Sequence, residues 1–148
     1  MSETDRIERT IVLRAPRSRV WRALTDAQEF GSWFRARIEG SFAVGQSVHA
    51  QSTYPGHEDA RWEMRIEDME PERLFAFRWP GGDATQDPAE WNRVEFRLED
   101  ASGGTRLTLV ESGFDRLPSE RRAQALRDNE GGWTAQMENI AKHVDHAA

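Results

Sequence analysis

The chain has 148 residues, no cysteine, a formal net charge of −6 and a hydrophobic fraction of 37%. This length fits a single domain, 1–148, whose ends at 1–5 and 146–148 are expected to fray. The absence of cysteine excludes disulfides and thiolate zinc sites, and the acidic balance argues against general affinity for nucleic acid or anionic lipid. Without a leader or an 18-residue apolar run, a cytoplasmic protein without membrane insertion is expected.

The first elements are a strand and two short helices. Arg6 to Arg14 alternates apolar and polar side chains, as a half-buried strand does. Pro16 follows, at a position that suits the first turn of a helix. One face of that helix then carries Val20, Trp21 and Leu24. A second short helix is expected from Asp26 to Trp33, with Asp26 as its cap.

From Arg35 to Phe114 the pattern is one strand after another. Apolar residues recur every second position in five rows, Val48–Ala50, Trp62–Met64–Ile66, Phe75–Phe77–Trp79, Val94–Phe96–Leu98 and Leu107–Leu109. Turn-forming residues separate the rows, so neighbouring strands are expected to be antiparallel. The longer stretch from Pro80 to Pro88 is interpreted as a loop.

The period changes again in the last part of the chain. From about Ser119 to His146, apolar residues return at helical intervals. A helix of about 27 residues is about 40 Å long, enough to cross a whole sheet. Gly131 and Gly132 lie in its middle, where each costs roughly 1 kcal/mol relative to alanine. A close backbone approach or a kink beside Trp133 is therefore expected.

These elements indicate an α+β protein with a helix-grip arrangement. Six to seven antiparallel strands form a curved sheet around the long C-terminal helix, and two short helices follow the first strand. One face of the sheet is apolar and the other charged, so only one face needs a cover. The space left between bulky side chains on the covered face is the expected ligand cavity.

Several segments together resemble the SRPBCC (START-like) superfamily. They are Pro16…Val20-Trp21…Leu24-Thr25, Trp33-Phe34, Gly103-Gly104-Thr105-Arg106-Leu107-Thr108-Leu109, Glu111-Ser112-Gly113-Phe114 and Gly132-Trp133. The later segments are similar to one branch, the homologues of the C-terminal domain of the activator of heat shock protein 90 ATPase. The resemblance runs from about Ile7 to about Val144. It implies a helix-grip fold with a hydrophobic cavity that holds lipids, polyketides or other small apolar molecules.

Glu111 and Arg9 are the candidate polar site residues. Counting by twos places Glu111 on the apolar face with Leu107 and Leu109, and Arg9 on the inner face of the first strand. If the first and last strands are antiparallel neighbours, as the resemblance implies, pairing Leu13 with Leu107 puts Arg9 opposite Glu111. The two are then a ligand anchor, an acid/base pair, or a structural ion pair that closes the barrel.

The candidate cavity wall is aromatic and sulfur-rich, which suits flat or flexible apolar ligands. Its expected members are Trp62, Met64, Phe75, Phe77, Trp79, Phe96, Trp133 and Met137. Any of them could instead belong to a solid core. Tyr54 is interpreted as a loop anchor at the rim. The His57-Glu58-Asp59 cluster and the pair His143 and His146 lack the convergent ligands of a metal site, so neither metal nor cofactor is expected.

Three functions remain open at this stage. The first is binding of a small hydrophobic ligand as carrier or sensor, by a monomer or homodimer. The second is a cyclase, aromatase or hydratase that uses Glu111, with Arg9 or the outward-facing His49, in acid/base chemistry. The third is a chaperone-associated or other protein-interaction module, which needs an exposed apolar patch.

Overall fold

The computed structural model describes residues 6–80, 91–117 and 119–145. Its strands are β1 (Arg6–Leu13), β2 (Ala36–Glu39), β3 (Ser47–Ser52), β4 (Arg61–Glu70), β5 (Leu74–Trp79), β6 (Asn92–Ala101) and β7 (Gly104–Ser112). Its helices are α1 (Arg17–Thr25), α2 (Ala27–Phe34), the 3-10 turn η2 (Phe114–Arg116) and α3 (Ser119–Asp145). The expected frayed ends, and most of the expected loop from Pro80 to Pro88, lie outside the described residues.

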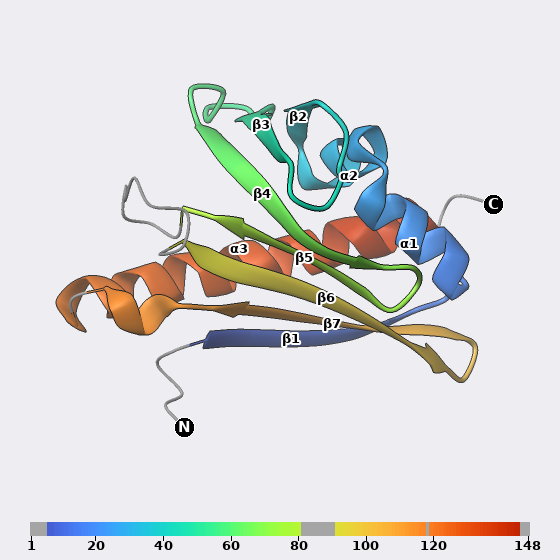
Figure 1. Ribbon diagram of the computed structural model, residues 1–148. Coiled ribbons are helices and arrows are strands. Elements are labelled where there is room, and N and C mark those ends of the chain that lie inside the picture. The colour runs from blue at the N-terminus through green and yellow to red at the C-terminus, as the bar shows by residue number, and fades with distance from the viewer. Residues whose placement is uncertain (1–5, 81–90, 118, 146–148) are drawn as a thin grey trace.

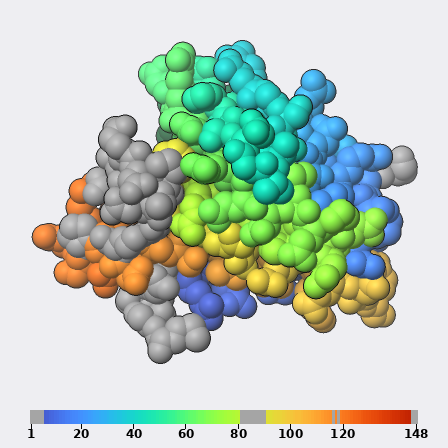
Figure 2. All heavy atoms as spheres, in the orientation of Figure 1, coloured from blue at the N-terminus to red at the C-terminus, as the bar shows by residue number. Residues whose placement is uncertain are grey.

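The strands form one antiparallel sheet in the order β1-β7-β6-β5-β4-β3-β2. The helix α3 runs along one face of this sheet, and α1 and α2 lie at one end of it (Figure 1). In the same orientation, with all atoms drawn, the strands hide most of α3, and only its N-terminal part, in orange, emerges beyond the sheet (Figure 2). The expected α+β helix-grip architecture is confirmed.

Short-range signals in the first third of the chain are also confirmed. Asp26 precedes α2, and its carboxylate accepts hydrogen bonds from the backbone N–H groups of Gln28 and Glu29 at 3.0 and 3.1 Å. Pro16 immediately precedes α1. At the other end of α2, Arg35 adopts a left-handed conformation with φ of 64°, which ends the helix and turns the chain into β2.

The expected register of β1 is wrong by two residues. Leu13 pairs with Thr105, so Ile7 lies opposite Glu111 and Arg9 lies opposite Leu109. The cause is a close approach at Gly104, where an added Cβ would lie 1.8 Å from the carbonyl oxygen of Leu13. Because only glycine fits there, the two strands meet at Gly104 rather than two residues further along.

Aromatic side chains fill the middle of the sheet's inner face. Phe75, Phe77 and Phe96 are fully buried and contact one another, with ring centroids 5.7 to 6.4 Å apart. Phe30 of α2 packs edge-on against Phe77 at 6.3 Å. Such edge-to-face and offset contacts are the geometry that aromatic rings prefer. This part of the interior is a packed core.

The helix α3 is continuous through both glycines. An added Cβ on Gly131 or Gly132 would meet no atom within 4 Å, so the expected close backbone approach is wrong. The helix is fixed on the sheet by buried side chains on one face, Trp133, Met137, Ile140 and Val144. No helix within the described ranges is long and apolar enough to cross a membrane.

Candidate functional site

Glu111 is a fully buried carboxylate with four hydrogen-bond donors. Its Oε2 atom accepts from Trp79 Nε1 at 2.8 Å and Asn92 Nδ2 at 3.0 Å. Its Oε1 atom accepts from Trp133 Nε1 at 2.8 Å and Asn129 Nδ2 at 3.0 Å. A carboxylate has about four lone-pair sites, so these donors fill its hydrogen-bonding capacity.

None of the four described donors to Glu111 carries a positive charge. Burying a carboxylate costs free energy unless its oxygens are hydrogen-bonded, and hydrogen bonds to an ionised group are stronger than neutral ones. Indole N–H groups can only donate, so the site is built around an acceptor-only group. Hydrogen bonding therefore satisfies the carboxylate, and among the described side chains no arginine or lysine contacts it.

The fold brings these donors together from three elements. Trp79 ends β5 and pairs with Asn92, which begins β6. Glu111 pairs with Val94, two residues further along β6 and on the same face as Asn92. Asn129 and Trp133 are four residues apart on α3, so their side chains lie on one helical face. The carboxylate thus joins the end of the sheet to α3.

An apolar pocket of about 120 Å³ lies beside this carboxylate. Its aromatic lining consists of Phe34, Trp79 and Trp133, and α3 contributes Asp128, Asn129, Gly132 and Gln136. We call this space the tryptophan pocket. Three of the four donors to Glu111 line it, so the carboxylate lies behind the wall and holds that wall in place.

The three rings of the tryptophan pocket pack against one another. Trp79 and Trp133 are stacked, with centroids 5.6 Å apart and an interplanar angle of 29°. Phe34 meets them edge-on at 5.9 and 6.1 Å. The backbone oxygen of Phe34 accepts a 2.9 Å hydrogen bond from Gln136 of α3. The wall is therefore held from α2, β5 and α3 together.

Gly132 contributes empty space to this pocket. Because an added Cβ would meet nothing within 4 Å, no packing demand explains a glycine at this helix position. Gly132 lines the pocket, whereas Gly131 does not. A side chain at position 132 would take up volume that a ligand could use.

The structure brings together three of the predicted site residues and separates Arg9 from them. Glu111, Trp79 and Trp133 meet as described. The predicted pairing of Arg9 with Glu111 is wrong, because the guanidinium of Arg9 lies 3.6 Å from Glu130 of α3. It also donates a 3.5 Å hydrogen bond to Thr134. The cause is the register of β1 against β7, which places Arg9 opposite Leu109.

The other predicted wall residues lie deeper in the fold. Met64, Phe75, Phe77, Phe96 and Met137 are buried in the core and do not line the tryptophan pocket. Trp62 is half-buried and packs against Phe34, at 6.2 Å between ring centroids, outside the lining of the tryptophan pocket. Its indole N–H is buried and has no hydrogen-bond partner within the described part of the chain.

Sequence reasoning missed Phe34, Asn92, Asp128, Asn129 and Gln136. Two of them carried a usable signal. Asn129 precedes Trp133 by four residues on α3, and Asn92 precedes Val94 by two on β6, so each shares a face with a predicted inward residue. Phe34 and Gln136 depend on how α2 docks against α3, which no local pattern indicates.

The remaining polar candidates lie elsewhere. Tyr54 is half exposed, and the Arg35 guanidinium lies 5.1 Å from its ring centroid, as a loop anchor would. His143 hydrogen-bonds Glu29 at 2.9 Å, and His146 lies outside the described residues. Within the described ranges, no three His, Asp or Glu side chains converge as metal ligands do.

Glu29 joins the three helices. It forms ion pairs with Arg19 and Arg22 of α1, each at 2.8 Å, and contacts His143 of α3. Partial burial alone would raise the pKa of Glu29. The hydrogen bonds from His143 and Arg19 and the charges of both arginines outweigh burial and lower this pKa below its usual value.

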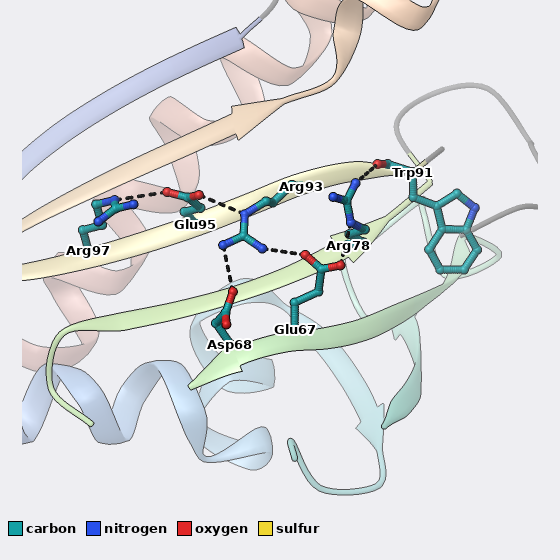
Figure 3. Close-up of polar contacts among 7 residues, drawn as sticks. All are labelled: Glu67, Asp68, Arg78, Trp91, Arg93, Glu95 and Arg97. Atoms are coloured by element: carbon teal, nitrogen blue, oxygen red, sulfur yellow. Dashed lines mark hydrogen bonds and ion pairs between the residues drawn. The ribbon is translucent and has the colours of Figure 1, made fainter. Parts of the chain in front are cut away.

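The outer face of the sheet carries a network of paired charges (Figure 3). Arg93 of β6 contacts three carboxylates, those of Glu67, Asp68 and Glu95. Glu67 and Asp68 are consecutive, and both reach Arg93 because a bulge in β4 between Ile66 and Asp68 breaks the alternation.

The outer carboxylates differ from Glu111 in having cationic partners. Burial opposes ionisation of Glu95, but the hydrogen bond and charge of Arg93, followed by those of Arg97, lower its pKa. For Arg93, burial lowers the pKa, and hydrogen bonds to Glu95, Asp68 and Glu67 raise it overall. A wider hollow of about 370 Å³ on β2–β4 is lined by charges of both signs, including Arg37, Glu39 and Glu63, and also by Trp62.

The family described as "Activator of Hsp90 ATPase homolog 1-like protein" matches residues 14–145. Protein MLL2253 from Mesorhizobium loti has a similar structure, with a TM-score of 0.80 and 23% identity, covering 97% of this chain and 98% of that one. The Aha1 dimer from Colwellia psychrerythraea is similar with a TM-score of 0.75 and 15% identity, covering 95% of this chain and 96% of that one.

DynU16, described as a protein in the dynemicin biosynthetic locus, is also similar. Its TM-score is 0.76 at 20% identity, over 96% of this chain and 48% of DynU16. At these identities the likeness establishes the fold alone. Among curated proteins none matches the sequence.

Proposed function

The chain belongs to the Activator of Hsp90 ATPase homolog 1-like family, in the SRPBCC (START-like) superfamily, and we propose that it binds a small, largely apolar molecule in the tryptophan pocket. The protein acts as a carrier or sensor, not as an enzyme, and works in the cytoplasm. One observation carries this proposal. Trp79, Asn129 and Trp133 line the pocket and are held by the same buried carboxylate.

Preorganisation is the physical reason for this assignment. Binding costs free energy when side chains must be ordered, and a wall already fixed by hydrogen bonds reduces that cost. Glu111 is therefore a positioning residue, which holds both indole rings at a set angle. Aromatic walls with a few placed polar groups are typical of small-molecule sites.

An acid/base role for Glu111 has less support. A general base must reach the proton that it removes, directly or through one water molecule. All four lone-pair sites of this carboxylate already accept hydrogen bonds from protein groups, and the side chain is fully buried. A substrate would first have to displace one of these donors.

A protein-interaction role has less support as well. Large exposed hydrophobic residues in the described part of the chain are Val12 on β1, Val44 before β3 and Tyr54 after β3. They come from separate segments, whereas a docking surface needs a contiguous apolar patch.

The experiment is native mass spectrometry of freshly purified protein, on the wild type and two matched variants. Gly132→Leu fills the pocket, and Gly131→Leu puts the same side chain on the next helix position. We expect the wild type and Gly131→Leu to retain a ligand that Gly132→Leu lacks. Equal retention by all three proteins contradicts the proposed site.

A further inference from the structure

We propose that the molecule held in the tryptophan pocket presents a positively charged alkylated ammonium group to it. This inference rests on the proposed function and adds the chemical class of the ligand. It follows from three features of the pocket: its charge, its rings and its size.

The charged side chains described at the pocket are acidic. Glu111 lies directly behind the wall with four neutral donors, and Asp128 is on the lining. Asp128 accepts a hydrogen bond at 2.8 Å from the amide of Gln124, whose oxygen accepts one from Arg127 at 2.9 Å, so a neutral amide separates Arg127 from Asp128. No lysine or arginine belongs to the described lining. An anionic head group would meet Asp128, with Glu111 behind the wall and no cation in the described lining to pair with it, whereas a cation is attracted to both carboxylates.

The rings favour the same charge. The face of an aromatic ring attracts a cation, and tryptophan does so most strongly. Both indoles donate their N–H to the Glu111 carboxylate, at 2.8 Å each. Donation to an anion leaves more electron density on the ring, which strengthens its attraction for a cation. The carboxylate thus acts on the ligand through Trp79 and Trp133, without touching it.

The size of the pocket limits what enters it. Its volume of about 120 Å³ is well below the roughly 300–1,000 Å³ of pockets that enclose a drug-sized molecule. A trimethylammonium or similar group fits this space, with the rest of the molecule outside it. Methyl groups on nitrogen also suit the rings, because they need no hydrogen-bond acceptor.

The test compares probes of one shape and different charge. Choline is the cation, 3,3-dimethylbutan-1-ol is its uncharged carbon analogue, and 3,3-dimethylbutanoate is the anion. Their dissociation constants are measured by calorimetry on the wild-type chain. We expect choline to bind at least about tenfold more tightly than the uncharged analogue, and the anion to bind more weakly than either.

Three variants complete the test. Asp128→Asn should weaken the binding of choline and leave the affinity for the uncharged probe unchanged. Gly132→Leu should abolish the binding of both probes. Gly131→Leu should bind both probes as the wild type does. Equal affinity for choline and the uncharged probe, or tighter binding of the anion, overturns the cation inference while the pocket stands. If no probe binds the wild type, the pocket proposal falls as well.

Discussion

The carboxylates on the two faces of strands β4 to β7 have different partners. On the outer face, Glu67 and Glu95 are partly exposed and each contacts two arginines. On the inner face, Glu111 is fully buried and contacts four neutral N–H groups. Adjacent residues contribute to both sites, since Arg78 and Trp79 of β5 point to opposite faces.

This difference separates two uses of charge. The outer pairs neutralise each other near solvent, where such pairs contribute little to stability. The inner carboxylate instead accepts four hydrogen bonds from neutral groups and thereby holds two indole rings in place. The outer arrangement suits a solvated surface, and the inner one suits a binding site.

The largest expected effect is a loss in the free energy of unfolding, which should be greater in Glu111→Gln than in Glu67→Gln. A glutamine at 111 replaces one carboxylate oxygen by an NH₂ group, and either oxygen serves one indole. Because an indole N–H cannot accept, at least one buried donor loses its partner, at a cost of about 1–3 kcal/mol. Glu67→Gln should cost about 1 kcal/mol or less.

The measurement is the free energy of unfolding from urea titrations of both variants and the wild type. A loss of less than about 1 kcal/mol in Glu111→Gln is smaller than one unpaired buried donor costs. It would mean that the carboxylate does not tie the wall together.

A smaller effect of opposite sign is expected in α3. Gly131→Ala and Gly132→Ala should each raise the free energy of unfolding by about 0.5–1 kcal/mol, because alanine favours a helix and both positions have room for a Cβ. Thermal unfolding in the absence of ligand measures this gain. Destabilisation at position 132 alone would mean that the pocket wall is tighter there than described.

The pH dependence distinguishes the outer carboxylates. Because the pKa of Glu95 is lowered in the folded chain, its ionised form stabilises the fold above its usual pKa near 4.5. That contribution is lost as the pH falls through the lowered value. The stability difference between wild type and Glu95→Gln should therefore shrink between pH 6 and pH 3.

Unfolding free energies at several pH values measure this difference, with Glu99→Gln, an exposed carboxylate on the same strand, as the control. The control should show a smaller change over the same interval. A difference for Glu95→Gln that stays constant with pH would show that Arg93 and Arg97 do not favour its ionised form.

The smallest effect is expected at Arg9. Its contact with Glu130 is partly exposed and 3.6 Å long, so Arg9→Gln should cost about 0–1 kcal/mol. In the double variant that combines Arg9→Gln with Glu111→Gln, the two losses of unfolding free energy should add, since the two sites share no described partner. Strong coupling between the two changes in a double-mutant cycle would mean that Arg9 and Glu111 interact, contrary to the register of β1.

Local patterns in the sequence predict most of the fold. The two-residue period marks the strands, Asp26 marks the start of α2, and the return of helical spacing marks α3. The break in β4 alternation at Glu67 was not predictable, because a bulge inserts one residue without changing the composition. The register of β1 was missed because Gly104 acts through close backbone contact.

The candidate site was predictable only in part. Glu111 stands out as a charged residue in an apolar row, and Trp79 and Trp133 lie on predicted inner faces. Its partners from α3 depend on how that helix is rotated over the sheet. The predicted cavity between the sheet and α3 is replaced by a more specific space, since Phe75, Phe77 and Phe96 pack together and the described pocket lies beside Phe34.

The most direct measurement follows the indole N–H signals of the six tryptophans by NMR during a titration with choline. Trp79 and Trp133, assigned by Trp→Phe variants, should move together with choline and also in Glu111→Gln. The signal of Trp33, which donates to the backbone oxygen of Ala23, should stay in place. Stationary signals of Trp79 and Trp133 in both experiments would contradict a wall of tryptophans held by Glu111 around a ligand.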